Sequence, residues 1–496
     1  MIGSAEATRS TRTGWPAKMG RMQRRYAAVD GGAGAHLLAA LSGMDSRLRP
    51  ASSPRHADLL IVTGPITRKL APALREYARA LPQPAQALIV DTAASDLVLP
   101  DYVPAMDLLP RSPQVDVRSA EQIVDIIQRL APWPSIGLVT SAAFAEDTIK
   151  LPNKQQRELA TEMAVLSLGP IQALTAGPLR LLLICDGEQV LQAEVEAGFA
   201  RRGIAEAMIG VTWQEAATIA SAIDPLAHVA GRLAYVQALE HLQQWLPPSA
   251  TQEARQAALA VERAANHLWW LHRFLAFLAA PVPTERAWQC AMAVTRLGEA
   301  LWPQPTTIWL APRHPAPNVR PVASAELQRI VTKVGLLRQC ILRNRSLELR
   351  LRGVGVLPAG LLDGAGVSGP VRHTAEHGAG DAWSRMQTRL LAAATDLEAA
   401  GTALNAIGDT VRHEADRTEG NWHAPAGDAD VAVQGPRGQL GLHLVSGGGS
   451  GPAQVEWRRP SAALLALLPA ALAGQKLADA ETLVVSLDLA MAEADG

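Results

Sequence analysis

The stretch SPRHADLLIVTGPITRKLAPAL (residues 53–74) indicates how the N-terminal part of this chain folds. Its apolar run ADLLIVTG (57–64) ends in glycine, which is typical of a short buried strand that stops at a turn. The polar and apolar residues of TRKLAPALREYARAL (67–81) then recur with a helical spacing. The stretch therefore predicts a strand that is followed directly by a helix.

The same alternation continues as far as residue 130. AQALIVD (85–91) predicts a second strand, and SAEQIVDIIQRL (119–130) predicts an amphipathic helix. Ser119 is a suitable N-cap for that helix, because Glu121 and Gln122 follow in its first turn. Strands that alternate with helices are typical of a parallel, doubly wound α/β sheet.

Length, charge and cysteine content limit the class of protein. The 496 residues are too many for one hydrophobic core and predict two or three domains. A net charge of −1 provides no basic field, so we expect no nucleic-acid partner. Three scattered cysteines, Cys185, Cys290 and Cys340, exclude a disulfide-rich secreted scaffold and are each interpreted as buried structural residues. No apolar run is long enough to span a bilayer.

Changes in composition divide the chain into four parts. Residues 1–29 are interpreted as a basic, mobile tail, and residues 30–130 as the α/β domain. Residues 131–162 contain three prolines and are interpreted as a linker. Residues 163–496 predict an α+β, mainly helical domain, with antiparallel strands at its start, helices in its middle and strands near its end.

The strongest helix prediction in this second domain is RQAALAVERAANHLWWLHRFLAFLAA (255–280), whose apolar residues recur at threes and fours. Trp269 and Trp270 widen its apolar stripe and are interpreted as core residues rather than as a stacking site for a cofactor. A second long helix is predicted over 381–407. The glycine-rich SGGGSG (446–451) lacks the lysine of a phosphate-binding loop and is interpreted as a flexible hairpin tip.

Several of these pieces resemble two subunits of one known assembly. Residues 53–74, and more weakly about 30–128, resemble the small core subunit of respiratory complex I and of membrane-bound nickel–iron hydrogenases, which normally holds a four-iron cluster. Residues 163–496 resemble the partner subunit, which is related to the hydrogenase large subunit and forms the quinone site. The matching pieces are ERAANHLWWL (262–271), VGVLPAGLLDGAGVSGPVR (354–372), PRGQLGLHLVSGGGSGPAQVEWRRPS (436–461) and SLDLAMAEAD (486–495). The resemblance implies a bacterial gene fusion of both subunits.

The resemblance places the ligands of the family's iron–sulfur cluster on four positions that lack cysteine. These positions are Ala33, His36, Ala93 and Ser112. A four-iron cluster needs about four soft anionic ligands, usually thiolates, and alanine has no ligating group. We therefore expect loss of the iron–sulfur cluster and no cofactor at all. His36 is interpreted instead as a histidine in a turn or at the start of a helix.

The family's quinone-site residues are replaced as well. Gln172 falls where the family has a histidine, Arg201 falls where a second histidine stands, and Pro225 falls where a tyrosine stands. Donation of a proton to a quinone needs groups that release protons at the working pH. Glutamine and proline cannot do so, and arginine is permanently charged. Catalysis by this chain alone is therefore not expected, although the turn glycines and apolar helix faces of the fold are kept.

The motif HTAEH has the H-x-x-E-H spacing of one class of zinc proteases. His373 and His377 are the weak metal candidates in it, with Glu376 between them. Glycines flank the motif, and no further acidic ligand is evident downstream, so a solvated loop is the preferred interpretation. A zinc hydrolase is the weakest of the functions considered.

Two stronger functions remain open. The first is a cofactor-free structural subunit, a pseudo-enzyme, of a complex I-like or hydrogenase-like complex, held on antiporter-like, proton-translocating membrane subunits. The second is a subunit of the NADH–quinone oxidoreductase or hydrogenase type that still binds quinone and works with redox partners. The resemblance implies a peripheral position on the cytoplasmic side of the inner membrane, held by protein contacts. Arg201 and Arg202 are the predicted docking residues for the membrane partner.

Overall fold

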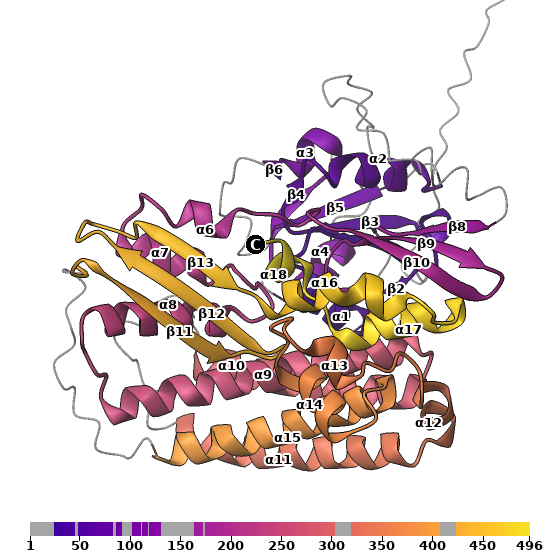
Figure 1. Cartoon of the computed structure of the whole chain (residues 1–496). Coiled ribbons are helices and arrows are strands. Elements are labelled where there is room, and N and C mark those ends of the chain that lie inside the picture. The colour runs from indigo at the N-terminus through magenta and orange to yellow at the C-terminus, as the bar shows by residue number, and fades with distance from the viewer. Residues whose placement is uncertain are drawn as a thin grey trace, which may run out of the picture.

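The computed structural model describes residues 24–44, 48–82, 86–91, 102–110, 112–117, 119–129, 163–171, 174–302, 319–406 and 423–496. The predicted linker (131–162) lies outside these described residues. Helices and strands from both parts of the chain pack into one body, in which the N-terminal sheet lies beside a layer of long helices (Figure 1). Among the described residues, none of the helices combines the length and apolar character that crossing a bilayer requires.

The N-terminal part contains a five-stranded parallel sheet with strand order β2-β1-β3-β5-β7. A short antiparallel pair, β4 and β6, lies beside it. The elements are β1 (Arg24–Asp30), α1 (Ala35–Met44), β2 (Leu48–Pro50), a 3₁₀ turn (Pro54–His56), β3 (Leu59–Thr63), β4 (Ile66–Thr67), α2 (Ala71–Arg79), β5 (Gln86–Asp91), β6 (Tyr102–Val103), α3 (Ala105–Leu108), β7 (Gln114–Asp116) and α4 (Ala120–Arg129).

Helices cover both faces of this sheet, because its central strands are apolar on both sides. Leu60 of β3 packs with Leu74 of α2 on one face. Leu59 of β3 packs with Leu41 of α1 and Ile123 of α4 on the other. The predicted alternation of strands and helices is therefore present. The Ser119 cap is present too, since its Oγ accepts from the Gln122 N–H at 3.4 Å.

The predicted N-terminal tail is too long by six residues, because β1 already begins at Arg24. The two arginines at the start of this strand are typical of a solvated segment. Tyr26, Ala27 and Val29 are nevertheless buried in the sheet, and the Arg25 N–H donates to the Asp58 carboxylate at 2.9 Å. Burial of these apolar side chains outweighs the charge of the flanking arginines.

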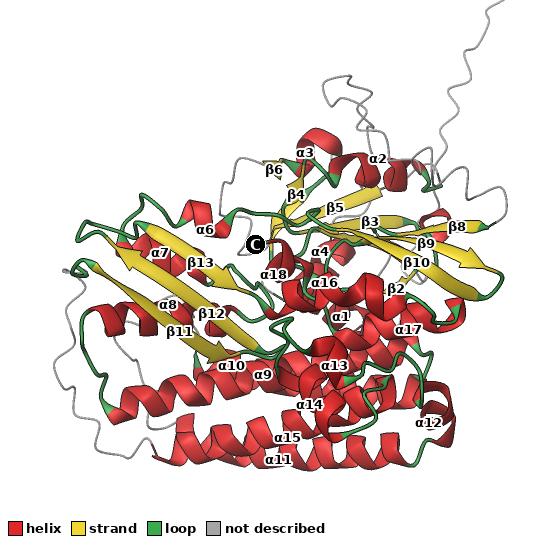
Figure 2. Ribbon diagram, in the orientation of Figure 1, coloured by secondary structure: helices red, strands yellow, loops and turns green. Residues whose placement is uncertain are grey.

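The second part begins with an antiparallel sheet of strand order β10-β9-β8, and a later antiparallel sheet has the order β11-β12-β13. Both sheets were expected, and Figure 2 shows them at opposite ends of the helical layer. The strands are β8 (Ala164–Leu168), β9 (Arg180–Asp186), β10 (Gln189–Glu196), β11 (Gly427–Gln434), β12 (Gln439–Ser446) and β13 (Gln454–Arg458). SGGGSG connects β12 to β13, and the indole N–H of Trp213 donates to the Gly449 carbonyl at 3.1 Å.

The helical layer is built around α9, which packs against α10 and α15. Trp269 and Trp270 of α9 are buried, as expected for core residues. The helices of this part are α6 (Ile204–Ala207), α7 (Trp213–Ala220), α8 (His228–Leu242), α9 (Ser249–Phe277), α10 (Pro281–Leu301), α11 (Val319–Leu342), α12 (Arg345–Leu351), α13 (Ala359–Leu362), α14 (Gly369–His377), α15 (Ala382–Ala406), α16 (Pro460–Leu472), α17 (Leu477–Leu487) and α18 (Met491–Asp495).

Helix α1 joins the two parts of the molecule. Its buried residues belong to the same hydrophobic core as those of the long helices. The Trp288 indole of α10 donates to the Ala40 carbonyl at 2.9 Å, and the Ser42 hydroxyl lies 3.0 Å from His272 Nε2 of α9. The α/β part is therefore fixed against the helical part by apolar packing and specific hydrogen bonds.

Candidate functional site

The turn after β1 lies where the two parts meet. Asp30 Oδ1 accepts from the backbone N–H groups of Gly32 (2.9 Å) and Gly34 (2.8 Å), which fixes the turn. Gly34 has no room for a side chain, because an added Cβ would lie 2.0 Å from Thr63 Oγ1. Burial raises the pKa of Asp30, although these N–H groups oppose the shift.

The structure describes three of the four predicted cluster positions. Ala33 follows the carboxyl end of β1, and Ser112 lies two residues before β7. The first residue of β7, Gln114, pairs with Ile89 of β5, which is level through β3 with Val29 near the end of β1. Ala93 lies outside the described residues.

His36 is the second residue of α1, which agrees with its interpretation as a residue in a turn or at the start of a helix. Its ring stacks on that of Trp269, with 6.0 Å between ring centroids. Burial and the nearby guanidinium groups of Arg273 and Arg437 hold the pKa of His36 well below its ordinary value.

The side chains at the described cluster positions do not fit a four-iron cluster. Ala33 has no ligating atom, and the Ser112 hydroxyl is not a soft anionic ligand. The three thiols lie elsewhere, in β9 (Cys185), α10 (Cys290) and α11 (Cys340). The first two are buried as expected, but Cys340 is only partly buried, because its helix leaves one face in solvent.

The structure describes two of the predicted quinone-site positions, Arg201 and Pro225, whose neighbouring segments are linked by the hydrogen bond from Arg202 to the Ile223 carbonyl. Gln172 lies outside the described residues. Arg201 is exposed and pairs with Glu206 at 3.1 Å, and Pro225 directly precedes the buried Leu226.

The prediction of Arg202 as a docking residue is wrong. Its side chain is 3% exposed, and its Nη2 donates to the carbonyls of Ile223 (3.0 Å) and Ala492 (2.9 Å). The turn that contains Arg202 packs against α18, the last helix, and this packing buries a guanidinium that the sequence predicted to be on the surface.

The helical part contains a buried group of charges, which we call the arginine network. It consists of Arg273, Arg389 and Arg437 with Asp224, Asp488 and Glu493. Arg437 contacts Asp224, donates from Nε to Glu493 at 3.0 Å, and places Nη1 3.7 Å from Asp488.

Asp488 links the other two arginines of the network. Its carboxylate accepts from Arg389 Nη1 at 2.9 Å and from Arg273 Nη2 at 3.1 Å. The network holds equal numbers of guanidinium and carboxylate groups from segments far apart in the sequence. Each charge of the set has a partner of opposite charge, which offsets much of the cost of burial, although Nε of Arg273 and Nε of Arg389 have no acceptor among the described residues.

Glu262 of α9 extends the network toward α8. Its carboxylate accepts from the Val229 N–H (2.8 Å) and the Ala230 N–H (3.1 Å) at the first turn of α8. Burial, with repulsion from Asp224, raises the pKa of Glu262 to about 8. Glu262 is therefore a buried group that titrates near neutral pH.

The sequence patterns did not indicate this network. Its members are single charges within apolar segments, such as Asp224 in SAIDPLAHV and Asp488 in SLDLAMAEAD. An isolated charge in an otherwise apolar run is the one signal that could have marked these residues as buried and paired.

His373 and His377 lie on helix α14 and not in a loop. Pro370 at the start of the helix fixes a backbone angle suited to the first turn, which explains the difference. Their rings lie 4.7 Å apart on the exposed side of the helix. Among the described residues, no three histidine, cysteine or acidic side chains are grouped so that they could hold a metal ion.

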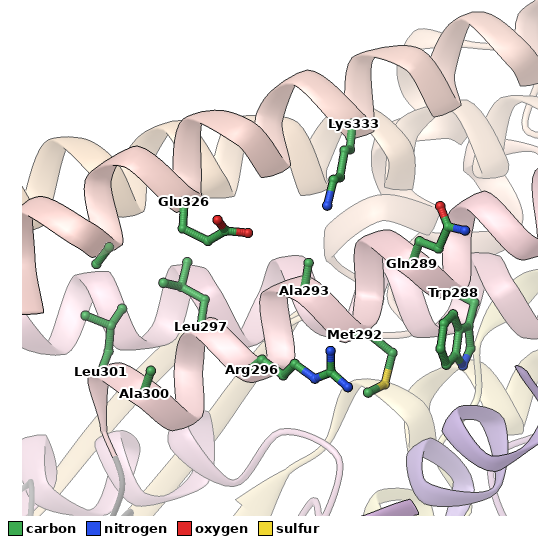
Figure 3. A pocket seen from close by; sticks show the side chains of 11 residues that line it. Trp288, Gln289, Met292, Ala293, Arg296, Leu297, Ala300, Leu301, Glu326 and Lys333 are labelled. Atoms are coloured by element: carbon green, nitrogen blue, oxygen red, sulfur yellow. The ribbon is translucent and has the colours of Figure 1, made fainter. Parts of the chain in front are cut away.

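A separate groove lies between α10 and α11, with a cavity volume of about 470 Å³ (Figure 3). Trp288, Met292 and Leu297 form apolar parts of its wall, and Lys333 points toward it from α11. No residue predicted from the sequence lines this groove. The groove borders the contact between α1 and α10, because Trp288 in its wall is also the residue that donates to the Ala40 carbonyl.

Comparison with known proteins gives matches of one kind. Residues 387–496 match the family model of the respiratory-chain NADH dehydrogenase, 49 Kd subunit. The chain is 26% identical over 429 residues to an NADH-quinone oxidoreductase subunit of Herpetosiphon aurantiacus, and the match covers 73% of this chain and 98% of that protein. It is 26% identical over 406 residues to NADH-quinone oxidoreductase subunit 4 of Thermus thermophilus, with 71% and 98% covered.

Among solved structures, the fold is similar to a chain of the membrane-bound sulfane sulfur reductase, an archaeal respiratory membrane complex. The TM-score is 0.62 at 21% identity, with 68% of this chain and 99% of that chain covered. Together, the sequence matches and this likeness of fold support a complex I-like or hydrogenase-like large subunit within this chain.

Proposed function

We propose that this chain is a cofactor-free structural subunit of a complex I-like, membrane-bound complex, in which a small-subunit-like part (30–130) and a large-subunit-like part (163–496) are fused. The observation that carries the proposal is the turn after β1. Ala33 stands there between Gly32 and Gly34, and a Cβ added to Gly64 would lie 3.3 Å from the Ala33 Cβ. The backbone is close-packed at this point, and the side chain offers nothing to iron.

The matches to NADH-quinone oxidoreductase subunits of two bacteria support the large-subunit part of the proposal. The parallel sheet supports the small-subunit part, since it presents the carboxyl end of β1 to the helical part. We propose that the complex lies on the cytoplasmic face of the inner membrane and that proton-translocating membrane subunits are the partners.

Affinity purification from mild detergent, with the co-purifying proteins identified, tests this function. We expect antiporter-like membrane subunits to co-purify without flavin or iron–sulfur subunits. Co-purification of such redox subunits would support the alternative, a quinone-binding oxidoreductase subunit. A protein that fractionates free of membranes when its neighbouring genes are co-expressed would contradict both.

Metal analysis after anaerobic purification tests the cofactor-free part separately. We expect no stoichiometric iron or nickel and no visible absorbance from an iron–sulfur cluster. A content of about four irons per chain would overturn this part of the proposal.

The docking face is proposed around residues 198–203 and 222–228. Because Arg202 is buried, only Arg201 can offer an arginine charge to a partner there. Arg201→Glu should weaken retention on membranes by a modest factor, since exposed ion pairs contribute about 1 kcal/mol or less. Arg458→Glu, at an exposed arginine of β13 paired with Asp430, is the matched control.

A further inference from the structure

Arg202 is a buried cation whose hydrogen bonds are incomplete. Two donations from Nη2 go to the carbonyls of Ile223 and Ala492. Neither its Nε nor its Nη1 has a partner among the described residues. A buried guanidinium that leaves donors unpaired costs free energy, so an acceptor at this site would stabilise the folded state.

The carboxylates nearest to Arg202 already have other partners. Asp224 contacts Arg437 and accepts from the Leu226 N–H at 3.0 Å. Asp495 accepts from the N–H groups of Gly198 and Ala200, both at 2.8 Å. Each of them attracts Arg202 through space, but neither accepts a hydrogen bond from its Nε or Nη1. Within the described part of the chain, Arg202 therefore has no carboxylate of its own.

Tyr102 of the α/β part supplies a second unpaired group, on a strand whose partner, β4, bonds to the segment before Arg202. It pairs with Thr67 in the β4–β6 ladder, and the Thr67 hydroxyl donates to the Phe199 carbonyl at 2.6 Å, three residues before Arg202. The Tyr102 hydroxyl is buried without a partner among the described residues. Burial raises the pKa of Tyr102 to about 12 and the charge of Arg202 opposes the shift, so the two side chains interact electrostatically.

The predicted cluster turn borders this place as well. Gly32 lies against Ala200 and Ala492, because a Cβ added to Gly32 would be 3.1 Å and 3.2 Å from their Cβ atoms. Ala492 is also the residue whose carbonyl accepts from Arg202. The unpaired donors therefore lie at the contact between the two parts of the chain.

We propose that Arg202 and Tyr102 bind a small oxyanion with a single negative charge, of the carboxylate or bicarbonate kind. Nε and Nη1 of Arg202 donate to its oxygens, and the Tyr102 hydroxyl provides a further donor. A single charge balances the guanidinium, whereas a dianion would leave excess negative charge beside Asp224 and Asp495. A cation is repelled by Arg202.

Ligand-dependent thermal stability of the full chain tests this site. Formate, acetate and bicarbonate are compared with chloride at equal ionic strength and pH. We expect the thermal midpoint to rise with concentration for at least one of the three oxyanions, because a ligand that binds only the folded state stabilises it. Which of the three acts most strongly distinguishes a carboxylate ligand from bicarbonate.

Two variants locate the effect. Tyr102→Phe removes a hydroxyl that has no partner in the described part of the chain, so the fold should be unaffected while the apparent Kd rises about two- to tenfold, as expected for one hydrogen bond. Arg202→Met should abolish the oxyanion effect, and Arg201→Met, the exposed neighbour, should keep it. The proposal fails if no oxyanion stabilises the wild type more than chloride does, or if Tyr102→Phe responds as the wild type. Water would then be the acceptor for these donors.

Discussion

The arginine network and the Arg202 site are both buried and both include guanidinium groups, but they differ in how charge is balanced. In the network, three arginines meet three carboxylates supplied by the chain itself. At the Arg202 site, the one arginine donates to carbonyls and, among the described residues, to no carboxylate. Both regions include buried Nε atoms without an acceptor among the described residues, those of Arg273 and Arg389 in the network and that of Arg202 at its site. The difference is that each network arginine has a carboxylate partner from the chain, whereas Arg202 has none in the described part of it.

The largest effect on stability is expected from replacing Arg437, the arginine at the centre of the network. Arg437→Met leaves Asp224 and Glu493 buried without their guanidinium. We expect the free energy of unfolding to fall by about 3–5 kcal/mol, as for other buried ion pairs that lose one member. Chemical denaturation of the purified variant measures this loss.

Arg458→Met is the control for that experiment. Arg458 also pairs with a carboxylate, that of Asp430, but more than half of each side chain is exposed to solvent. We expect a change of at most about 1 kcal/mol. Equal effects of the two substitutions would show that the network contributes no more than a surface pair.

Glu262, beside the network, should make the free energy of unfolding depend on pH. Its folded-state pKa is raised from 4.5 to about 8, so the folded state binds a proton more tightly than the unfolded state does. This contribution is fully present below about pH 4.5 and is lost as the pH rises through about 8. Its size is at most about 5 kcal/mol across that window.

Glu262→Gln removes the titration and keeps an oxygen that can accept from the N–H groups of α8. The neighbouring side chains of Asp224, Arg437 and His228 are unchanged in this variant. We expect the thermal midpoint of the wild type to fall relative to that of the variant between about pH 5 and pH 8. Parallel pH profiles for the two proteins would show that Glu262 does not titrate in this range.

The smallest effect is expected where α1 joins the two parts. Gly43→Ala would place a Cβ 2.6 Å from Trp288 Nε1, which bonds to the Ala40 carbonyl. We expect a loss of about 1–3 kcal/mol from this overpacking. Gly335→Ala in α11 has no atom within 4 Å of the new Cβ and should stabilise by about 0.5–1 kcal/mol. A neutral Gly43→Ala variant would mean that this contact adapts without cost.

The elements that the sequence predicts well are those whose signal is local. The apolar run of β3, the Ser119 cap of α4 and the apolar stripe of α9 each depend on neighbouring residues, and each is present. Strand β1 was missed because Arg24 and Arg25 give its start the composition of a solvated segment. Propensity is a weak guide where burial in a sheet decides the conformation.

The site was harder to predict because its contacts are long-range. Asp224 meets Arg437 across 213 positions, and Arg202 meets the Ala492 carbonyl across 290. No pattern within a window of the sequence indicates such pairs, and a charged residue is by default expected in solvent. For this reason the sequence places Arg202 on the surface, whereas the lack of a ligating or proton-donating group at Ala33 and Pro225 follows directly from the residue type.

The order of the network along the chain has a consequence for biosynthesis. Glu493 is translated 56 residues after Arg437, and Asp488 is translated 99 residues after Arg389. At about 5–20 residues per second, the nascent chain carries these arginines for several seconds before their carboxylates exist. The parallel sheet of the first part can form on the ribosome, but the helical part must wait for its last hundred residues. A chaperone that shields these unpaired arginines during that interval would raise the yield of folded protein.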